Sequence, residues 1–445
     1  MTPDSNQHTA AGRLPPLAAD RFDVGSTEDS LERLVAAARD AGPLFRIFAP
    51  GRGSDTWIVN NPTDIKRVLV TNHRNYTKGV GLDRVRILLG NGIMTSEGEV
   101  WRRQRRMIQP FFHRRVIEQF AALVDQCVEE RLERWQASAA RDAPIDVTEE
   151  MSELTLDIVV GSIFGTDREW LIAETGGNPF SIVTEQSARN LQFAYKFRSL
   201  TRLVADLARK RRAAAEEHFD FLGMLMAARD KDSGEPMSER ELLDEVMTLV
   251  VAGHETSASA LAWTWYLLAH NPEAMAKVAA EADAAPSTTG LGFQASENFR
   301  YTQATLQEAM RLYPPGWLLS RRTIAPDVLS GFEVPAGADV MLSPYLIQRH
   351  PDYWDRPEEF RPERFIEAAS DPRDEWKYIP FAAGPRHCVG ENFAMYEMTV
   401  HVARVARDWR LEYIDDGPVE IEAAINLRSR KSLRMRLVPR RQSSS

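Results

Sequence analysis

One cysteine, Cys388, lies in a segment whose residue types suit a sulfur ligand. The segment 381–390 reads Phe-Ala-Ala-Gly-Pro-Arg-His-Cys-Val-Gly, and a run with helical periodicity over 392–406 follows at once. A thiolate at a helix N-terminus is stabilised by the helix dipole and by free backbone N–H groups. Glycines lack a Cβ atom, so a flat ligand can approach the backbone closely. The segment therefore suits a sulfur ligand for a large planar metal cofactor, although a buried core thiol in a glycine-rich turn is the alternative.

Polar residues also interrupt the longest helix that the sequence predicts. Residues 252–257 read Ala-Gly-His-Glu-Thr-Ser, in the middle of a long helical pattern that begins at a capping box formed by Ser238 and Glu241. Glycine and threonine are weak helix formers, and Glu255 needs a partner or water in a buried helix. Unfavourable choices gathered at one place indicate a functional site, whereas a polar kink in a structural helix is the alternative. We interpret His254 as a structural residue and not as a metal ligand.

Two further pairs of residues have spacings that place them on one face of a helix. Glu308 and Arg311 are three residues apart, and Trp101 and Arg105 are four residues apart, so the members of each pair can interact. An indole N–H and a guanidinium suit a carboxylate ligand, because arginine favours two-point contacts with carboxylates. Each pair by itself is also compatible with a solvated surface, where an ion pair contributes little.

These four segments together resemble the cytochrome P450 superfamily. Segment 381–390 is similar at every fixed position to its haem-binding signature, Phe-x-x-Gly-x-Arg-x-Cys-x-Gly, and 252–256 is similar to its oxygen-activation motif, (Ala/Gly)-Gly-x-(Asp/Glu)-Thr. The other two pairs resemble the Glu-x-x-Arg and Trp-x-x-x-Arg motifs, and Arg364, after Pro-Glu, supplies the third member that accompanies Glu-x-x-Arg. All four segments occur in the family's order.

The resemblance implies a haem b cofactor and assigns roles to individual residues. Glu255 and Thr256 are the implied catalytic residues, which pass protons inward. The Glu308, Arg311 and Arg364 set is implied to be structural. The implied cofactor-binding residues are Cys388, which is also the metal ligand, Trp101, Arg105, Arg322, Arg386, Phe381, Gly384 and Gly390. Arg321 can replace Arg322 in contacting a haem propionate, since the strand register at that point is not determined.

The implied reaction is a haem-thiolate monooxygenation. One atom of dioxygen enters a lipophilic small molecule (a terpene, fatty acid, steroid or polyketide-like compound), and a separate redox partner supplies the electrons. The thiolate pushes electron density toward the iron, which favours O–O cleavage. Two alternatives stay open, namely a peroxygenase or rearrangement catalyst on the same haem, and a non-catalytic haem sensor. The Glu255–Thr256 pair argues against the peroxygenase, because a peroxide-driven site has less need of a proton relay.

Composition indicates a cytoplasmic globular protein. The chain has 445 residues, of which 43% are hydrophobic, and two cysteines, so it can build a large core but no disulfide framework. Such cysteine usage points to a reducing compartment, and Cys127 lies in an apolar helical run that predicts a core thiol. Neither residues 1–25 nor any later segment offers the roughly 20 apolar residues of a membrane span, so we expect no membrane anchor. The net charge of −9 argues against nucleic-acid binding.

The positive charge of this acidic chain is concentrated in one short segment. Its members are Arg102, Arg103, Arg105, Arg106, Arg114 and Arg115. Because no flavin or iron–sulfur motif is present, electrons must come from another protein. The resemblance implies that this segment lies on the same face as the Cys388 loop. We therefore expect an acidic ferredoxin or flavodoxin, with its reductase, to be steered there by charge.

Helix signals dominate the chain, which predicts a mainly α fold with small β-sheets. Residues 31–38 form one predicted helix, and 44–48 with 56–59 form a predicted hairpin. Strands at 332–334 and 339–342 are expected to pair with each other across Pro335-Ala336-Gly337. We expect one domain over 26–439, between a flexible N-terminal tail, 1–25, and a flexible tail, 440–445. The resembled fold is a triangular helical prism crossed by one long helix.

The substrate region is the part that departs from the resembled family. Segment 165–219 is shorter than the family's substrate lid, which means either an abbreviated lid or residues absent from this sequence. Two lid helices, 180–194 and 201–216, are expected with almost no loop between them. Apolar residues expected to line the pocket, with ordinary core packing as the alternative for each, are Leu88, Leu89, Leu249, Val250, 317–319, Ala424 and Ile425.

Overall fold

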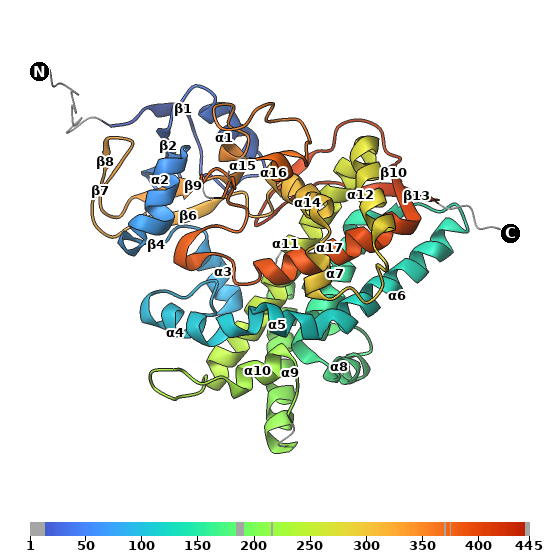
Figure 1. Cartoon of the computed structure of the whole chain (residues 1–445). Helices are drawn as coiled ribbons and strands as arrows, with labels where there is room; N and C mark the ends of the chain where they lie inside the picture. The colour runs from blue at the N-terminus through green and yellow to red at the C-terminus, as the bar shows by residue number, and fades with distance from the viewer. Residues whose placement is uncertain (1–13, 184–190, 215–216, 369–370, 374, 441–445) are drawn as a thin grey trace, which may run out of the picture.

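The computed structural model describes residues 14–183, 191–214, 217–368, 371–373 and 375–440. Strands β2 (Leu44–Ala49), β4 (Tyr76–Lys78), β6 (Leu319–Thr323) and β9 (Asp339–Leu342) gather at the upper left of Figure 1, and helices fill the centre and the right. The longest helix, α11 (Glu239–His270), packs along α7 (Val147–Phe164) and also contacts α14 and α17. The mainly α architecture with small sheets therefore agrees with the sequence prediction.

The central helix α11 begins and ends where local sequence rules require. Ser238 accepts a hydrogen bond from the Glu241 N–H, and the Glu241 side chain bonds back to the Ser238 N–H, which confirms the predicted capping box. The helix ends at Asn271, directly before Pro272. With 32 residues it is roughly 48 Å long at 1.5 Å per residue. Buried residues occur along its whole length, so it crosses the core.

Helices α12 and α14 pack against both α11 and α17. The remaining helices are α1 (Ser30–Ala38), α2 (Pro62–Lys66), α3 (Leu82–Leu89), α4 (Gly98–Ile108), α5 (Arg114–Ile117), α6 (Ala121–Ala139), α8 (Asp167–Thr175), α9 (Leu191–Ala214), α10 (Phe221–Ala227), α12 (Pro272–Ala284), α13 (Phe293–Ser296), α14 (Arg300–Leu312), α15 (Pro344–Ile347), α16 (Arg364–Glu367) and α17 (Glu391–Asp408). Cys127 is buried in α6, where burial raises its pKa to about 12, as expected for an inert core thiol.

The largest sheet has six strands and contains the predicted hairpin. Its order is β1 (Leu17–Arg21), β2 (Leu44–Ala49), β3 (Ser54–Val59), β9 (Asp339–Leu342), β6 (Leu319–Thr323) and β4 (Tyr76–Lys78). Strands β2 and β3 pair antiparallel, as predicted, while β3 and β9 pair parallel. Smaller sheets are formed by β10 (Trp409–Tyr413) with β13 (Arg434–Pro439) and β5 (Ile145–Asp146), and by β11 (Ile421–Ala423) with β12 (Leu427–Ser429).

The second predicted strand pair was wrong, although both strands exist. Strand β8 (Phe332–Val334) pairs with β7 (Asp327–Leu329), and β9 pairs instead with β3 and β6. Ser330 and Gly331 join β7 to β8 with φ angles of 48° and 80°, the combination that a tight two-residue hairpin requires. Both edges of β9 are occupied by β3 and β6, so β8 has no edge to join there.

The described ends of the two predicted tails make contacts with the rest of the fold. Strand β1, inside the expected tail 1–25, pairs with β2, and Phe22 and Val24 are buried. Their apolar side chains therefore hold the chain to the sheet before residue 26. At the other end, Arg440 donates to the carbonyl oxygens of Ala406 and Arg407 and is held to the end of α17. Residues 1–13 and 441–445 lie outside the described residues.

The predicted break in the lid segment is also absent. Helix α9 runs without interruption through residues 195–200, where the sequence analysis separated two helices. Its 24 residues include neither glycine nor proline, so no residue in it favours a break. Part of the first expected helix, 184–190, lies outside the described residues, and so do 215–216.

Candidate active site

Backbone geometry forms the loop that carries Cys388. Ala382 and Gly384 have φ angles of 57° and 72°, in the left-handed region. A Cβ atom at Gly384 would lie 2.1 Å from the Leu69 carbonyl oxygen, so a residue larger than glycine does not fit. The Cys388 N–H donates to the Phe381 carbonyl oxygen at 2.9 Å and closes the loop. Two of the residues expected around the cysteine, Phe381 and Gly384, therefore shape the loop itself.

The Cys388 sulfur lies where this loop meets α17. The backbone N–H groups of Gly390 and Glu391, at the start of the helix, bond to the sulfur and favour its thiolate. Desolvation by burial nevertheless raises the pKa of the thiol above its ordinary value. The Cys388 side chain is exposed to solvent, although the protein atoms around it desolvate the sulfur. The sulfur therefore faces a recess inside the molecule and not its outer surface.

The polar residues of α11 make contacts that leave them partly accessible. The Thr256 hydroxyl donates to the Ala252 carbonyl oxygen one turn earlier at 2.8 Å. Glu255 accepts a hydrogen bond at its Oε2 from Asn426 Nδ2 at 2.7 Å. Both side chains are half-buried, while His254 before them and Ser257 and Ala258 after them are buried. A carboxylate and a hydroxyl are thus presented together on one turn of this largely buried helix.

His254 points away from this pair and toward α7. Its Nε2 lies 2.9 Å from Ser152 Oγ, and burial lowers the pKa of the ring to about 4. The imidazole is therefore neutral near pH 7, in agreement with a structural role. Gly253 allows the two helices to approach, since a Cβ atom there would lie 3.0 Å from Val159 Cγ2.

A group of cations gathers between β4, β6 and the Cys388 loop. The Arg386 guanidinium lies over the Trp101 ring, 4.5 Å from its centroid, and pairs with Glu97. Desolvation and the nearby Arg386 lower the pKa of Arg321 to about 10, and the same two causes lower the pKa of Lys78 to about 7. Positive charge therefore exceeds the charge of Glu97 at this place, which suits an anionic ligand.

Two of the arginines expected to bind the cofactor contact protein groups in the structure. Arg321 and Arg322 are neighbours on β6, so their side chains leave opposite faces of the sheet. Arg322 is 45% exposed and pairs with Asp339 at 2.8 Å, while the buried Arg321 joins the cation group. Arg105 donates from Nη1 to the His387 carbonyl oxygen at 2.8 Å and thereby contacts the backbone directly before Cys388.

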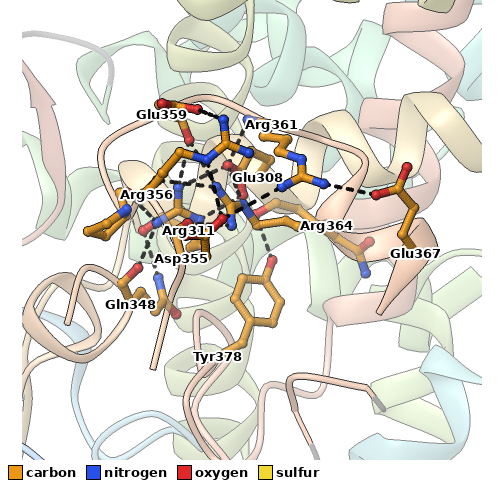
Figure 2. Close-up of polar contacts among 12 residues, drawn as sticks. Glu308, Arg311, Gln348, Asp355, Arg356, Glu359, Arg361, Arg364, Glu367 and Tyr378 are labelled. Atoms are coloured by element: carbon orange, nitrogen blue, oxygen red, sulfur yellow. Dashed lines mark hydrogen bonds and ion pairs between the residues drawn. The ribbon is translucent and has the colours of Figure 1, made fainter. Parts of the chain in front are cut away.

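The Glu308 set holds the chain that leads to the Cys388 loop. Figure 2 shows Arg311 and Arg364 converging on the Glu308 carboxylate, with the Arg311 Nε to Glu308 Oε2 distance at 2.7 Å and the Arg364 Nε to Oε1 distance at 2.9 Å. Arg311 also donates to the carbonyl oxygens of Gln348 and Pro357. Glu308 and Arg311 have fully buried side chains, so this is an internal cluster and not a surface ion pair.

Comparisons with known proteins identify the family. The family model described as Cytochrome P450 matches residues 16–174 and 179–432. The chain is 33% identical to cyclooctatin synthase of Streptomyces melanosporofaciens over 80% of each chain. It is 29% identical to pentalenene oxygenase of Streptomyces avermitilis, over 85% of this chain and 86% of the relative. It is also 29% identical to the chloroplastic carotene epsilon-monooxygenase of Arabidopsis thaliana, over 90% of this chain and 80% of the relative.

The chain belongs to the cytochrome P450 family. It is a cytochrome P450 monooxygenase, and the family brings a haem cofactor. Three local features fit a haem: a recessed sulfur with N–H support, a loop that glycine brings close to its surroundings, and a buried excess of positive charge for the propionates. In the described part of this P450, no helix is both long and apolar enough to cross a bilayer.

The expected pocket residues of this P450 divide into two groups. Leu89, Val250 and Trp317 are at most 2% exposed. They are therefore core residues, which was the alternative given for each of them. The others are half-buried or exposed, and their accessible atoms can contact a ligand: Leu88, Leu249, Leu318, Leu319, Ala424 and Ile425. Asn426, next to Ile425, was missed, because its contact with Glu255 joins segments 171 residues apart and leaves no local sequence signal.

Acidic residues partly neutralise the arginine segment of the P450. Arg103 pairs with Glu241 at 2.5 Å, and Arg106 pairs with Asp232 at 2.8 Å. Arg102 is 55% exposed beside Glu99, and Arg115 is exposed. The positive surface is therefore narrower than the sequence indicated, although α4 does lie beside the Cys388 loop through the Arg105 contact.

Proposed function

We propose that this P450 hydroxylates or epoxidises a cyclic terpenoid, with haem b bound through the Cys388 thiolate. The site carries the haem part of the proposal, because its one recessed thiol receives the N–H groups of Gly390 and Glu391. The relatives carry the substrate part, because their names include a pentalenene oxygenase and a carotene monooxygenase. The half-buried and exposed apolar side chains around Leu318 and Ile425 suit a hydrocarbon skeleton.

The haem-holding residues follow from the contacts above. Cys388 is the proposed metal ligand, and Phe381, Gly384 and Gly390 form its loop. Arg321, Arg386 and Trp101 are proposed to hold the propionates, with Arg105 supporting the loop and Arg322 outside the group. When bound, the haem supplies dioxygen activation, in which two electrons and two protons leave one oxygen atom in the product and one in water.

The propionate assignment predicts different results for two adjacent arginines. Arg321→Ala is expected to speed haem transfer to apomyoglobin roughly tenfold or more, because a charge-assisted hydrogen bond contributes about 1.5–3 kcal/mol. Arg322→Ala, its matched control, removes a half-exposed arginine that pairs with Asp339 and is expected to leave the transfer rate unchanged. Faster transfer from the Arg322 variant alone would reverse the assignment.

Glu255 and Thr256 are proposed to deliver the protons. Thr256→Ala is expected to lower the amount of product per NADPH roughly tenfold and to release peroxide instead, because one hydroxyl of the relay is gone. Thr264→Ala is the matched control, since Thr264 makes the same bond to a carbonyl one turn earlier, at 2.7 Å to Ala260, in a buried part of α11. An equal amount of product per NADPH in the Thr256 and Thr264 variants would contradict the proposed proton relay.

An acidic ferredoxin or flavodoxin is the proposed electron donor. A hollow of about 260 Å³ lies against the Cys388 loop, and Arg373, Trp376 and His387 are among its lining residues. Together with Arg102 and Arg115 on the neighbouring elements, this surface offers a shape and a charge that an acidic partner can match.

Charge steering predicts that reduction by such a donor slows as salt rises. Arg102→Glu is expected to lower the second-order reduction rate severalfold at low salt, with the difference vanishing at high salt, where charges are screened. Arg410→Glu, at an exposed position of strand β10, is the control for a general change in net charge. A reduction rate independent of salt would contradict docking by charge.

The proposed function is tested with the purified protein and a small substrate panel. A strongly red-shifted Soret band of the dithionite-reduced, carbon monoxide-bound protein is expected for a haem with a thiolate ligand. Four compounds are then added separately in a spin-state titration, namely pentalenene, β-carotene, lauric acid and one cyclic diterpene hydrocarbon. Turnover with donor proteins follows. Oxygenated product from a terpene supports the proposal, whereas oxygenation of lauric acid alone would overturn its substrate part.

A further inference from the structure

One polar face of α11 binds the hairpin formed by β11 and β12. Glu255, Ser259 and Trp263 are spaced four residues apart, so they lie on the same side of the helix. Glu255 accepts from Asn426 Nδ2 at 2.7 Å, while the Leu427 carbonyl oxygen accepts from Ser259 Oγ at 2.5 Å and from Trp263 Nε1 at 3.3 Å. The hairpin turn is therefore held in register with the catalytic turn of the helix.

Hydrogen bonds also hold the opposite side of the hairpin turn. The Leu427 N–H donates to the Pro315 carbonyl oxygen at 3.0 Å, and the buried Trp317 donates from Nε1 to the Ala424 carbonyl oxygen at 3.0 Å. Between these anchors the tip is open, and Ile425 is 53% exposed. One short turn thus carries both an apolar tip and the amide that contacts Glu255.

We propose that Asn426 is a positioning residue, which holds the Glu255 carboxylate for proton delivery and makes that delivery depend on the hairpin tip. The inference rests on the proposed function. Glu255 takes a proton from water and gives it to the Thr256 hydroxyl oxygen, while the hydroxyl passes its own proton onward, so both groups end the cycle unchanged. The Asn426 amide N–H keeps the carboxylate at the turn of Thr256 without supplying a proton itself.

The shared turn explains how a substrate affects the proton path. A hydrocarbon that contacts Ile425 presses on the residue adjacent to Asn426. Hydrogen bonds hold the carbonyl oxygens of Ala424 and Leu427 in place. The backbone on either side of the turn is therefore restrained, and a displacement of Ile425 moves Asn426. Substrate occupancy is therefore transmitted to the position of Glu255 through a single peptide unit.

Asn426→Leu tests the proposal, because leucine keeps the volume and removes the donor. Product per NADPH with the terpene that gives the largest spin-state change is expected to fall roughly three- to tenfold, with the substrate dissociation constant within about twofold of wild type. Amide hydrogen exchange over 421–429, a readout independent of turnover, is expected to accelerate. Arg428→Ala is the matched control, since Arg428 lies on the same hairpin and pairs with Glu422.

A partner exchange separates positioning from mere support of the fold. In the double variant Glu255→Gln/Asn426→Asp, the hydrogen-bond donor and acceptor change sides. Slow amide exchange over 421–429 is therefore expected to return. The amount of product per NADPH is expected to stay low, because glutamine carries no transferable proton. Full coupling in Asn426→Leu, or restored coupling in the exchanged pair, would overturn the inference and leave the proposed function standing. A wild-type protein without the red-shifted band would overturn the proposed function and this inference together.

Discussion

Cys388→Ser is expected to remove the red-shifted Soret band and to lower product formation at least about 100-fold, since the loss of groups that merely support a metal ligand already costs 10- to 100-fold. Sulfur and oxygen differ here in acidity. The N–H groups of Gly390 and Glu391 favour a thiolate, whereas a serine hydroxyl in the same desolvated place stays protonated. The absorption spectrum of the reduced protein under carbon monoxide measures the loss directly.

The other cysteine provides the control for this substitution. Cys127 is buried in α6, and desolvation by burial raises the pKa of its thiol to about 12, so it forms no thiolate near pH 7. Cys127→Ala is therefore expected to retain the band and the activity. Circular dichroism checks that both variants are folded. A Cys388→Ser protein that kept the red-shifted band would show that another group is the ligand.

Glu308→Ala is expected to produce the largest loss of stability, about 3–5 kcal/mol, because it leaves a buried cation without its partner. Arg311 has a fully buried side chain, and its guanidinium also holds the carbonyl oxygens of Gln348 and Pro357. The Gln348 side chain in turn accepts from the Ile379 N–H at 2.9 Å, two residues before Phe381. Loss of Glu308 therefore loosens the chain that enters the Cys388 loop.

Thermal unfolding of the haem-loaded protein, followed by the red-shifted band, measures this effect. Glu367→Ala is the matched control, because Glu367 pairs with Arg361 at 3.0 Å in the same part of Figure 2 but is 59% exposed. An exposed pair of this kind contributes less than about 1 kcal/mol. Equal changes in the two variants would mean that the internal cluster adds nothing beyond a surface ion pair.

Some features of the fold were predictable because their causes lie within a few residues of one another. The capping box of α11 joins Ser238 to Glu241, and the hairpin of β2 and β3 closes across a short turn. Strand β9 shows the limit of such reasoning. The strand propensity of its residues was evident in the sequence. Its partners β3 and β6, however, come from other parts of the chain, so the local turn at 335–337 indicated the wrong pairing.

The sequence by itself determined the family and indicated a role for Cys388, since a thiol, its glycines and the following helix start are contiguous. It also determined that Glu255 and Thr256 occupy one turn of a long helix. Only the tertiary structure showed that Arg321 is buried and Arg322 is exposed, because neighbouring side chains of β6 lie on opposite faces of the sheet and packing buries one of these faces. It alone brought Asn426 to Glu255, since a hydrogen bond between residues 171 apart depends on how the hairpin packs against α11.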